Sequence, residues 1–292
     1  MALLANAALG QSLSIRKGES EFLISAAAPP DTRYVLQASG NLHLWVDISD
    51  EVSGQVSNRI DSSGTTNLFF RLTAPIPFPP ITIVVLGDSS VADFASNFNL
   101  FNGWGQGLHG YFKPNARVIN LAYPGYSSKD FLASDEKAKM IAIKPDFVLV
   151  AFGLVDEFGV PEEATTLEEF EDNLKTILQI VRGFNGTPIL VTPSVERFFN
   201  AQGKTFPAYP DRFAVVADVA YELKTDFIDL NHLSVELVNQ MGKSGSDYIW
   251  SGVEYLHFSD KGAKIIAGLV ANALPDRLGP YLIGIFNPRP KP

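Results

Sequence analysis

The chain has 292 residues, of which 46% are apolar and 19% charged, so it can bury a large core as one domain or two unequal ones. Its formal net charge of -9, with no cluster of Lys or Arg, argues against nucleic acid or an anionic membrane as a partner. Because the chain contains no cysteine, disulfides, thiolate catalysis and cysteine-based metal sites are excluded.

The first residues are small and apolar. Residues 1–10 (MALLANAALG) resemble the end of a signal-peptide hydrophobic region that lacks its basic start, which predicts the remnant of a secretory signal. We therefore expect a secreted or periplasmic protein. No apolar run approaches the roughly 18 residues of a membrane-spanning helix.

Residues 11–72 have the pattern of a small all-β domain, similar to a β-sandwich accessory module. Short alternating runs predict strands, and clusters of Gly, Ser, Asn and Asp separate them; the expected strands are 22–24, 34–37, 42–46 and 68–72. Trp45 and Phe70 are expected in its core, with stacking on a glycan as the alternative. Residues 73–80 (TAPIPFPP) predict a stiff proline-rich linker before a catalytic domain over 81–292.

From Ile81 onward strands and helices alternate, which predicts an α/β domain with a parallel sheet. The expected strands begin with ITIVVLG at 81–87 and continue at 118–121, 147–152, 189–191 and 227–230. Helical spacing predicts helices over 104–112 and 167–181 and a last helix that stops near Pro275. Thr166 and Glu169 form a predicted capping box. The tail from 278 to 292 is expected to pack on the outside or to trail free.

Polar residues follow several of these strands, at the edge where open α/β sheets bind their ligands. Asp88 and Ser89 come directly after the first strand, either as a catalytic turn or as caps of the next helix. A serine nucleophile needs a base and a group that orients the base. Of the four histidines, His257 has the best context because Glu254 precedes it by three residues. His232 is a weaker candidate.

The order Gly87-Asp88-Ser89, Gly125, Gly153-Leu-Val-Asp156 and Glu254-x-x-His257 resembles the GDSL or SGNH hydrolases. The nearest likeness is to rhamnogalacturonan acetylesterase-like carbohydrate esterases, carried by blocks such as VINLAYPGYSSKDF from Val118 and HFSDKGAKIIAGLV from His257. The resemblance implies a flavodoxin-like three-layer α/β/α fold.

It also implies roles for individual residues. Ser89 is the expected nucleophile, His257 the base and Glu254 the acid that orients it, with Asp247 or Asp260 as substitutes for Glu254. The backbone amides of Ser89 and Gly125 are expected in the oxyanion hole, although Gly125 also fits an ordinary turn.

The chain departs from the family at three positions. Val155 stands where the family has an asparagine that donates to the oxyanion, and loss of one such donor costs roughly a hundredfold to a thousandfold in rate. Glu254 replaces the usual aspartate. Tyr126 stands where the acetylesterase-like relatives have a cation, which argues against an acidic sugar.

The remaining polar and aromatic candidates are less specific. Asp88 and Asp156 are expected to hold loops rather than to react. The candidate substrate pocket consists of Asp88, Trp104, Tyr126, Val155 and Arg197. A position in the core is the alternative for Trp104, and a surface loop is the alternative for Arg197.

We therefore predict a serine esterase that hydrolyses short-chain acetyl esters of a carbohydrate. A non-catalytic carbohydrate-binding protein of the same fold is the first alternative, and an acyltransferase or an esterase for longer acyl chains is the second. No phosphate-cradling loop and no metal-ligand spacing occurs, so neither a cofactor nor a metal is expected.

Overall fold

The computed structural model describes residues 12–17, 21–27, 35–39, 46–47, 55–61, 69–73, 78–94, 101–158, 162–252 and 255–283. The chain divides into two compact units, one formed by residues 80–273 and the other by residues 1–79 together with 274–292. The predicted signal remnant and the predicted core position of Trp45 lie outside the described residues.

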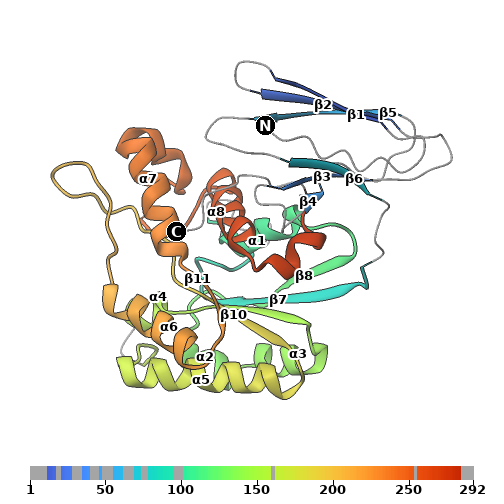
Figure 1. Ribbon diagram of the computed structural model, residues 1–292. Coiled ribbons are helices and arrows are strands. Elements are labelled where there is room, and N and C mark those ends of the chain that lie inside the picture. The colour runs from blue at the N-terminus through green and yellow to red at the C-terminus, as the bar shows by residue number, and fades with distance from the viewer. Residues whose placement is uncertain are drawn as a thin grey trace. The chain divides into compact units, whose positions relative to one another are not determined.

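The first unit contains two three-stranded antiparallel sheets (Figure 1). One has the order β1 (Ser12–Lys17), β2 (Glu21–Ala27) and β5 (Gln55–Asp61), and the other has β4 (Val46–Asp47), β3 (Val35–Ser39) and β6 (Phe69–Thr73). Strands β1 and β5 were not predicted, because their sequences SLSIRK and QVSNRID carry little aromatic or apolar signal. Phe70 is buried as expected, with 3% of its surface exposed.

The end of the chain belongs to this first unit. The 3₁₀ helix η3 (Asp276–Tyr281) places the Tyr281 ring 5.7 Å from that of Phe78, and the Tyr281 hydroxyl donates to the carbonyl of Pro79 at 3.0 Å. The sequence assigned these residues to the catalytic domain, and the structure groups residues 274–292 with the N-terminal unit instead.

The second unit is built on a five-stranded sheet in which every neighbouring pair is parallel. Its order is β11 (Asp226–Ile228), β10 (Thr187–Val191), β9 (Phe147–Ala151), β7 (Ile81–Gly87) and β8 (Ala116–Asn120). Gly87 pairs with Ala151, and Val85 pairs with Asn120. The carboxyl ends of β7, β8 and β9 therefore meet at one edge, as predicted for a flavodoxin-like fold.

Helices cover both faces of this sheet and make three layers (Figure 1). One face carries α2 (Ser128–Ala133), α3 (Asp135–Ile143), α5 (Leu167–Gly183) and α6 (Pro210–Glu222), whose apolar side chains form a buried cluster with Val84, Leu86, Val148, Val150 and Leu190. The other face carries α1 (Trp104–Leu108), α7 (Leu230–Ser246) and α8 (Asp260–Ala273). Among the described residues, no helix is both long enough and apolar enough to cross a membrane.

The predicted capping box of α5 is confirmed. The Glu169 backbone N–H donates to the Thr166 hydroxyl at 3.1 Å, and the Thr166 N–H donates to the Glu169 carboxylate at 2.8 Å. Helices α2, α3, α6 and α7 were not individually predicted. Three shorter helices complete the unit: η1 (His109–Tyr111), α4 (Leu154–Phe158) and η2 (Asp247–Ile249).

Candidate active site

The turn that follows β7 is organised by the Asp88 carboxylate. One carboxylate oxygen accepts the Ser90 backbone N–H at 2.8 Å and the Ser90 hydroxyl at 2.7 Å. The Asp88 carbonyl accepts the N–H groups of Val91 at 3.1 Å and Ala92 at 3.0 Å. Ser89 lies half-buried at the tip of this turn, while Asp88 and Ser90 are buried. Asp88 thus has the loop-holding role predicted for it.

Helix α1 is packed tightly against this serine turn. The Trp104 N–H donates to the Ser90 carbonyl at 2.9 Å, and the Gly103 N–H donates to the Ala92 carbonyl at 3.0 Å. A Cβ added to Gly103 would lie 2.3 Å from the Val91 carbonyl carbon, closer than any side chain allows. Trp104 is 1% exposed, which fits the core alternative rather than a pocket wall.

The loop after β8 is joined to the same turn by Asn120. Its side-chain amide donates to the Val91 carbonyl at 2.8 Å, and its side-chain oxygen accepts the Ala122 N–H at 3.0 Å. The Tyr123 N–H donates to the Gly87 carbonyl at 3.0 Å. Gly125 follows in an exposed turn with a φ of 85°, a conformation that favours glycine.

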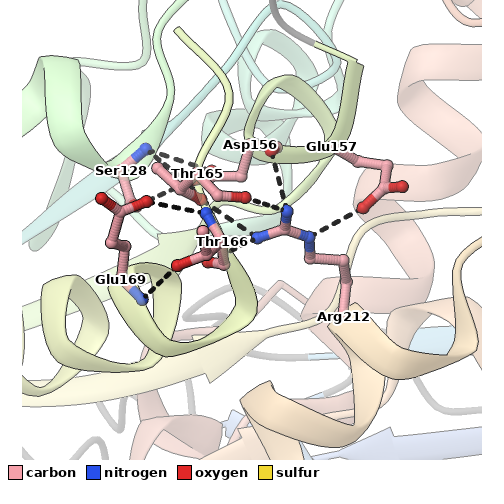
Figure 2. Close-up of polar contacts among 7 residues, drawn as sticks. All are labelled: Ser128, Asp156, Glu157, Thr165, Thr166, Glu169 and Arg212. Atoms are coloured by element: carbon pink, nitrogen blue, oxygen red, sulfur yellow. Dashed lines mark hydrogen bonds and ion pairs between the residues drawn. The ribbon is translucent and has the colours of Figure 1, made fainter. Parts of the chain in front are cut away.

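Asp156, in the short helix α4 that follows β9, links the segment after β8 to the segment after α4 (Figure 2). Its buried carboxylate accepts the Ser128 N–H at 3.1 Å, the Ser128 hydroxyl at 2.6 Å and the Thr165 hydroxyl at 3.0 Å. Burial raises the pKa of Asp156, and these hydrogen bonds together with the charge of Arg212 oppose the rise. Asp156 therefore holds loops, the role predicted from the sequence.

Arg212 completes this network and was not predicted. Its guanidinium donates to the Asp156 carbonyl and to the Thr165 hydroxyl, each at 3.0 Å, pairs with Glu157 at 2.9 Å, and lies 5.3 Å from the centre of the Phe170 ring (Figure 2). No sequence signal identifies it, because these partners lie 42 to 56 residues earlier in the chain.

His257 lies in a short strand-like segment beside the serine turn. Phe258 and Asn102 exchange two backbone hydrogen bonds of 3.1 Å, and the Ser251 N–H donates to the His257 carbonyl at 3.0 Å. The rings of Phe94 and Phe101 lie 5.4 and 4.8 Å from the imidazole. Residues 102–104 are thus hydrogen-bonded to the serine turn and to the residue after His257, which brings the two predicted catalytic segments together.

The predicted orienting acid, Glu254, lies outside the described residues. Its predicted substitutes are both engaged elsewhere: Asp247 pairs with Arg197 at 2.8 Å, and Asp260 pairs with Lys264 at 2.8 Å. The weaker base candidate, His232, is exposed on α7 and lies 3.5 Å from Glu236.

Two predicted pocket residues have polar partners within the unit. The Tyr126 hydroxyl donates to Glu136 at 3.2 Å, and its ring lies 4.5 Å from that of Tyr123. Burial and the Glu136 carboxylate raise the pKa of Tyr126. Arg197 forms an ion pair with Asp247, and Val155 is half-buried in α4. The loop after β8, residues 121–127, contains neither Lys nor Arg.

Glu196, in the loop after β10, was also missed by the sequence analysis. It is 7% exposed, and its Oε2 atom is buried without a hydrogen-bond partner in the part of the chain that the structure describes. Burial, followed by the charge of Asp88, raises the pKa of Glu196 to about 7. A glutamate in the largely apolar segment TPSVERFF was the only available signal.

Several known proteins are similar to this chain. The sequence model of the GDSL-like lipase/acylhydrolase family matches residues 85–265. The probable rhamnogalacturonan acetylesterase YesY of Bacillus subtilis is 31% identical over 202 residues, covering 66% of this chain and 92% of YesY. The rhamnogalacturonan acetylesterase RhgT of the same organism is 28% identical over 218 residues, covering 68% of this chain and 90% of RhgT.

Two solved structures share the fold. Bacillus subtilis YxiM matches with a TM-score of 0.62 at 23% identity, covering 92% of this chain and 78% of its own. The acetylxylan esterase Axe2 of Geobacillus stearothermophilus matches with a TM-score of 0.54 at 22% identity, covering 67% of this chain and 94% of its own. The YxiM match is longer than residues 80–273, so it extends into the N-terminal unit.

Proposed function

This chain belongs to the GDSL-like lipase/acylhydrolase family, and from that premise we propose that it is a serine esterase that removes acetyl groups from a carbohydrate. The observation that carries the proposal is the set of backbone hydrogen bonds made by the segment 102–104. It ties the turn that bears Ser89 to the strand-like segment that bears His257. This link supports a site in which the Ser89 hydroxyl and the His257 imidazole act together.

In the proposed reaction the Ser89 Oγ attacks the ester carbonyl carbon while His257 takes the hydroxyl proton. The oxyanion is held by the backbone N–H groups of Ser89 and Gly125. The intermediate then expels the sugar oxygen, which receives the proton from His257, and an acetyl group remains on Ser89. Water then attacks the acetyl group on Ser89 in the same way, which releases acetate and restores Ser89. Glu254 accepts from the other ring nitrogen and stabilises the imidazolium.

The surroundings of the loop after β8 support a neutral carbohydrate rather than an acidic one. Tyr126 carries no positive charge and hydrogen-bonds Glu136, and Arg197 is paired with Asp247, so neither offers a free cation to a uronate. Tyr123 and Tyr255, which lie two residues from Gly125 and His257 in the chain, have 50% and 57% of their area exposed. Exposed tyrosine rings can stack on the apolar faces of sugar rings. Acetylated polysaccharides occur outside the cytoplasm, and we therefore propose that the protein is exported.

The decisive experiment measures acetate release by the wild type and by Ser89→Ala from p-nitrophenyl acetate and from acetylated polysaccharides, neutral and acidic. We expect the variant to lose activity by a factor of roughly 10³ or more while its melting temperature is unchanged. Activity that survives in Ser89→Ala would refute the serine mechanism. Sugar binding without turnover of any ester by the wild type would identify a binding protein, and a preference for long acyl chains would identify a lipase-like esterase.

A further inference from the structure

Two phenylalanine rings contact the His257 imidazole, and the proposed mechanism does not use them. The Phe101 ring centre lies 4.8 Å from the imidazole centre with 41° between the ring planes, and the Phe94 ring centre lies 5.4 Å away at 84°. The two phenyl rings are themselves 6.2 Å apart. All three distances lie in the range of about 4.5 to 7 Å at which aromatic rings attract one another. The three rings therefore form one packed cluster.

The two phenylalanines start from backbone that is held together. The Ala92 carbonyl accepts the Gly103 N–H at 3.0 Å. Phe94 lies two residues after Ala92, and Phe101 lies two residues before Gly103. Both side chains are half-buried. The hydrogen bond thus fixes the two points from which the phenyl rings reach the imidazole.

The same part of the chain is paired with the segment that bears His257. Asn102 directly follows Phe101 and exchanges two backbone hydrogen bonds of 3.1 Å with Phe258, the residue after His257. Phe94 comes five residues after Ser89. The stretch that carries the proposed nucleophile therefore also carries the rings that contact the proposed base.

A catalytic histidine has to keep its ring in one orientation. The torsion about the Cβ–Cγ bond of a histidine is broad and roughly two-fold, so the backbone alone does not fix the direction of the ring. A carboxylate that accepts from one ring nitrogen restrains that edge and still allows the ring plane to tilt. Phe94 meets the imidazole at nearly a right angle and Phe101 at a smaller angle, so together they oppose tilting in different directions.

We propose that Phe94 and Phe101 are positioning residues that hold the His257 imidazole in the orientation in which it takes the proton of Ser89. This assignment rests on the proposed esterase function. Both residues act through His257 and transfer no proton themselves. Because misplacement of a reacting group by about 1 Å costs roughly a hundredfold in rate, loss of one ring should lower kcat by roughly tenfold to a hundredfold.

The first test measures kcat and KM of Phe94→Ala and Phe101→Ala with p-nitrophenyl acetate. In both variants kcat should fall while KM changes little. Phe101→Tyr keeps the ring and should retain most of the wild-type kcat. Phe184→Ala is the matched control, because Phe184 is also half-buried but lies just before the amino end of β10, at the opposite edge of the sheet. It should lower the melting temperature and leave kcat per folded molecule unchanged.

Removal of the base distinguishes positioning from contact with the ester. If Phe101 acts through the imidazole, Phe101→Ala should cost less than about twofold in the His257→Ala protein, because residues that act as a unit are not additive. A ring that contacts the ester itself would cost the same factor in both backgrounds. Equal losses in the two backgrounds would overturn the proposal, as would wild-type kcat in both alanine variants.

Phe101→Leu replaces Phe101→Ala in the same comparison if the alanine variant does not fold, because leucine fills much of the space without a flat ring. Equal losses of Phe101→Leu in the two backgrounds, or none in either, would then overturn the proposal. Failure of the esterase function itself is recognised separately, because Ser89→Ala or His257→Ala alone would then retain the wild-type activity.

Discussion

The buried carboxyl groups of Asp88, Asp156 and Glu196 follow strands of the parallel sheet. They differ in their hydrogen-bond partners and therefore in their roles. Asp88 and Asp156 each accept backbone N–H and hydroxyl groups of neighbouring loops. Glu196 has an oxygen without a partner among the described residues. Burial also raises the pKa of Asp88 to about 6, although the hydrogen bonds from Ser90 oppose the rise. Of the three, Glu196 is therefore the carboxyl group whose ionised form burial disfavours without an opposing hydrogen bond.

The raised pKa of Glu196 predicts a pH dependence of stability. Its pKa is 4.5 in the unfolded chain and about 7 in the folded one, so the stabilising contribution is complete below 4.5 and is lost as the pH rises through 7. The loss amounts to about 3 kcal/mol for this shift. Asp88 acts in the same direction.

Urea unfolding of the wild type and of Glu196→Gln at a series of pH values checks this prediction. The difference between the two free energies of unfolding should move by a few kcal/mol in favour of Glu196→Gln from about pH 4 to about pH 8. Acidic residues that do not interact with Glu196 contribute equally to both proteins and cancel. Parallel curves would show that the Glu196 pKa is not raised in the folded state.

At the scale of elements, helix α1 determines the position of the serine turn. Gly103 allows the backbone of α1 to touch Val91 and Ala92, and a Cβ there would lie between 2.3 and 2.5 Å from their backbone atoms. We expect Gly103→Ala to lower stability by about 1 to 3 kcal/mol through overpacking. Because the displaced turn carries Ser89, esterase activity should fall as well.

Gly110→Ala is the matched control for this prediction. Gly110 lies in η1 and has no left-handed φ, and a Cβ added to it would meet nothing within 4 Å. Melting temperature and kcat should be unchanged in Gly110→Ala and reduced in Gly103→Ala. Equal behaviour of the two variants would show that α1 does not position the turn.

The capping box of α5 gives a second test at this scale. Thr166→Ala removes the side-chain acceptor of the Glu169 N–H and should cost about 1 kcal/mol, or roughly 2 to 4 °C in melting temperature. Thr176→Ala, at an exposed position inside the same helix, is the control and should not destabilise the protein. Activity per folded molecule should be unaffected in both.

At the scale of the whole molecule, the two ends of the chain belong to one unit. Tyr281 in η3 contacts Phe78 and Pro79, so a catalytic fragment has to omit both ends rather than the N-terminal part alone. The YxiM match extends over 92% of the chain, so the N-terminal unit is a shared part of the fold.

This division predicts how two fragments behave. Residues 80–273 should remain soluble and hydrolyse p-nitrophenyl acetate, because the sheet and the candidate site lie within them. Residues 80–292 retain Leu278 and Tyr281 without the unit that buries them, and should aggregate more readily. Light scattering and acetate release measure both properties. If the longer fragment is the better behaved, the assignment of η3 to the first unit is wrong.

The sequence by itself determined the parallel sheet, the α5 capping box and the serine turn, because each depends on residues close together in the chain. Local signals also identified the order of the family's blocks from Gly87 to His257. The strands β1 and β5 escaped prediction because their stability comes from pairing with β2 rather than from their own composition.

Only the tertiary structure decided the contacts between distant segments. It buried Trp104, neutralised Arg197 with Asp247, and built the Asp156 and Arg212 network. It also buried Glu196 and grouped residues 274–292 with the first unit. Burial and long-range charge depend on which segments the folded chain places side by side, and no local pattern of residues encodes that.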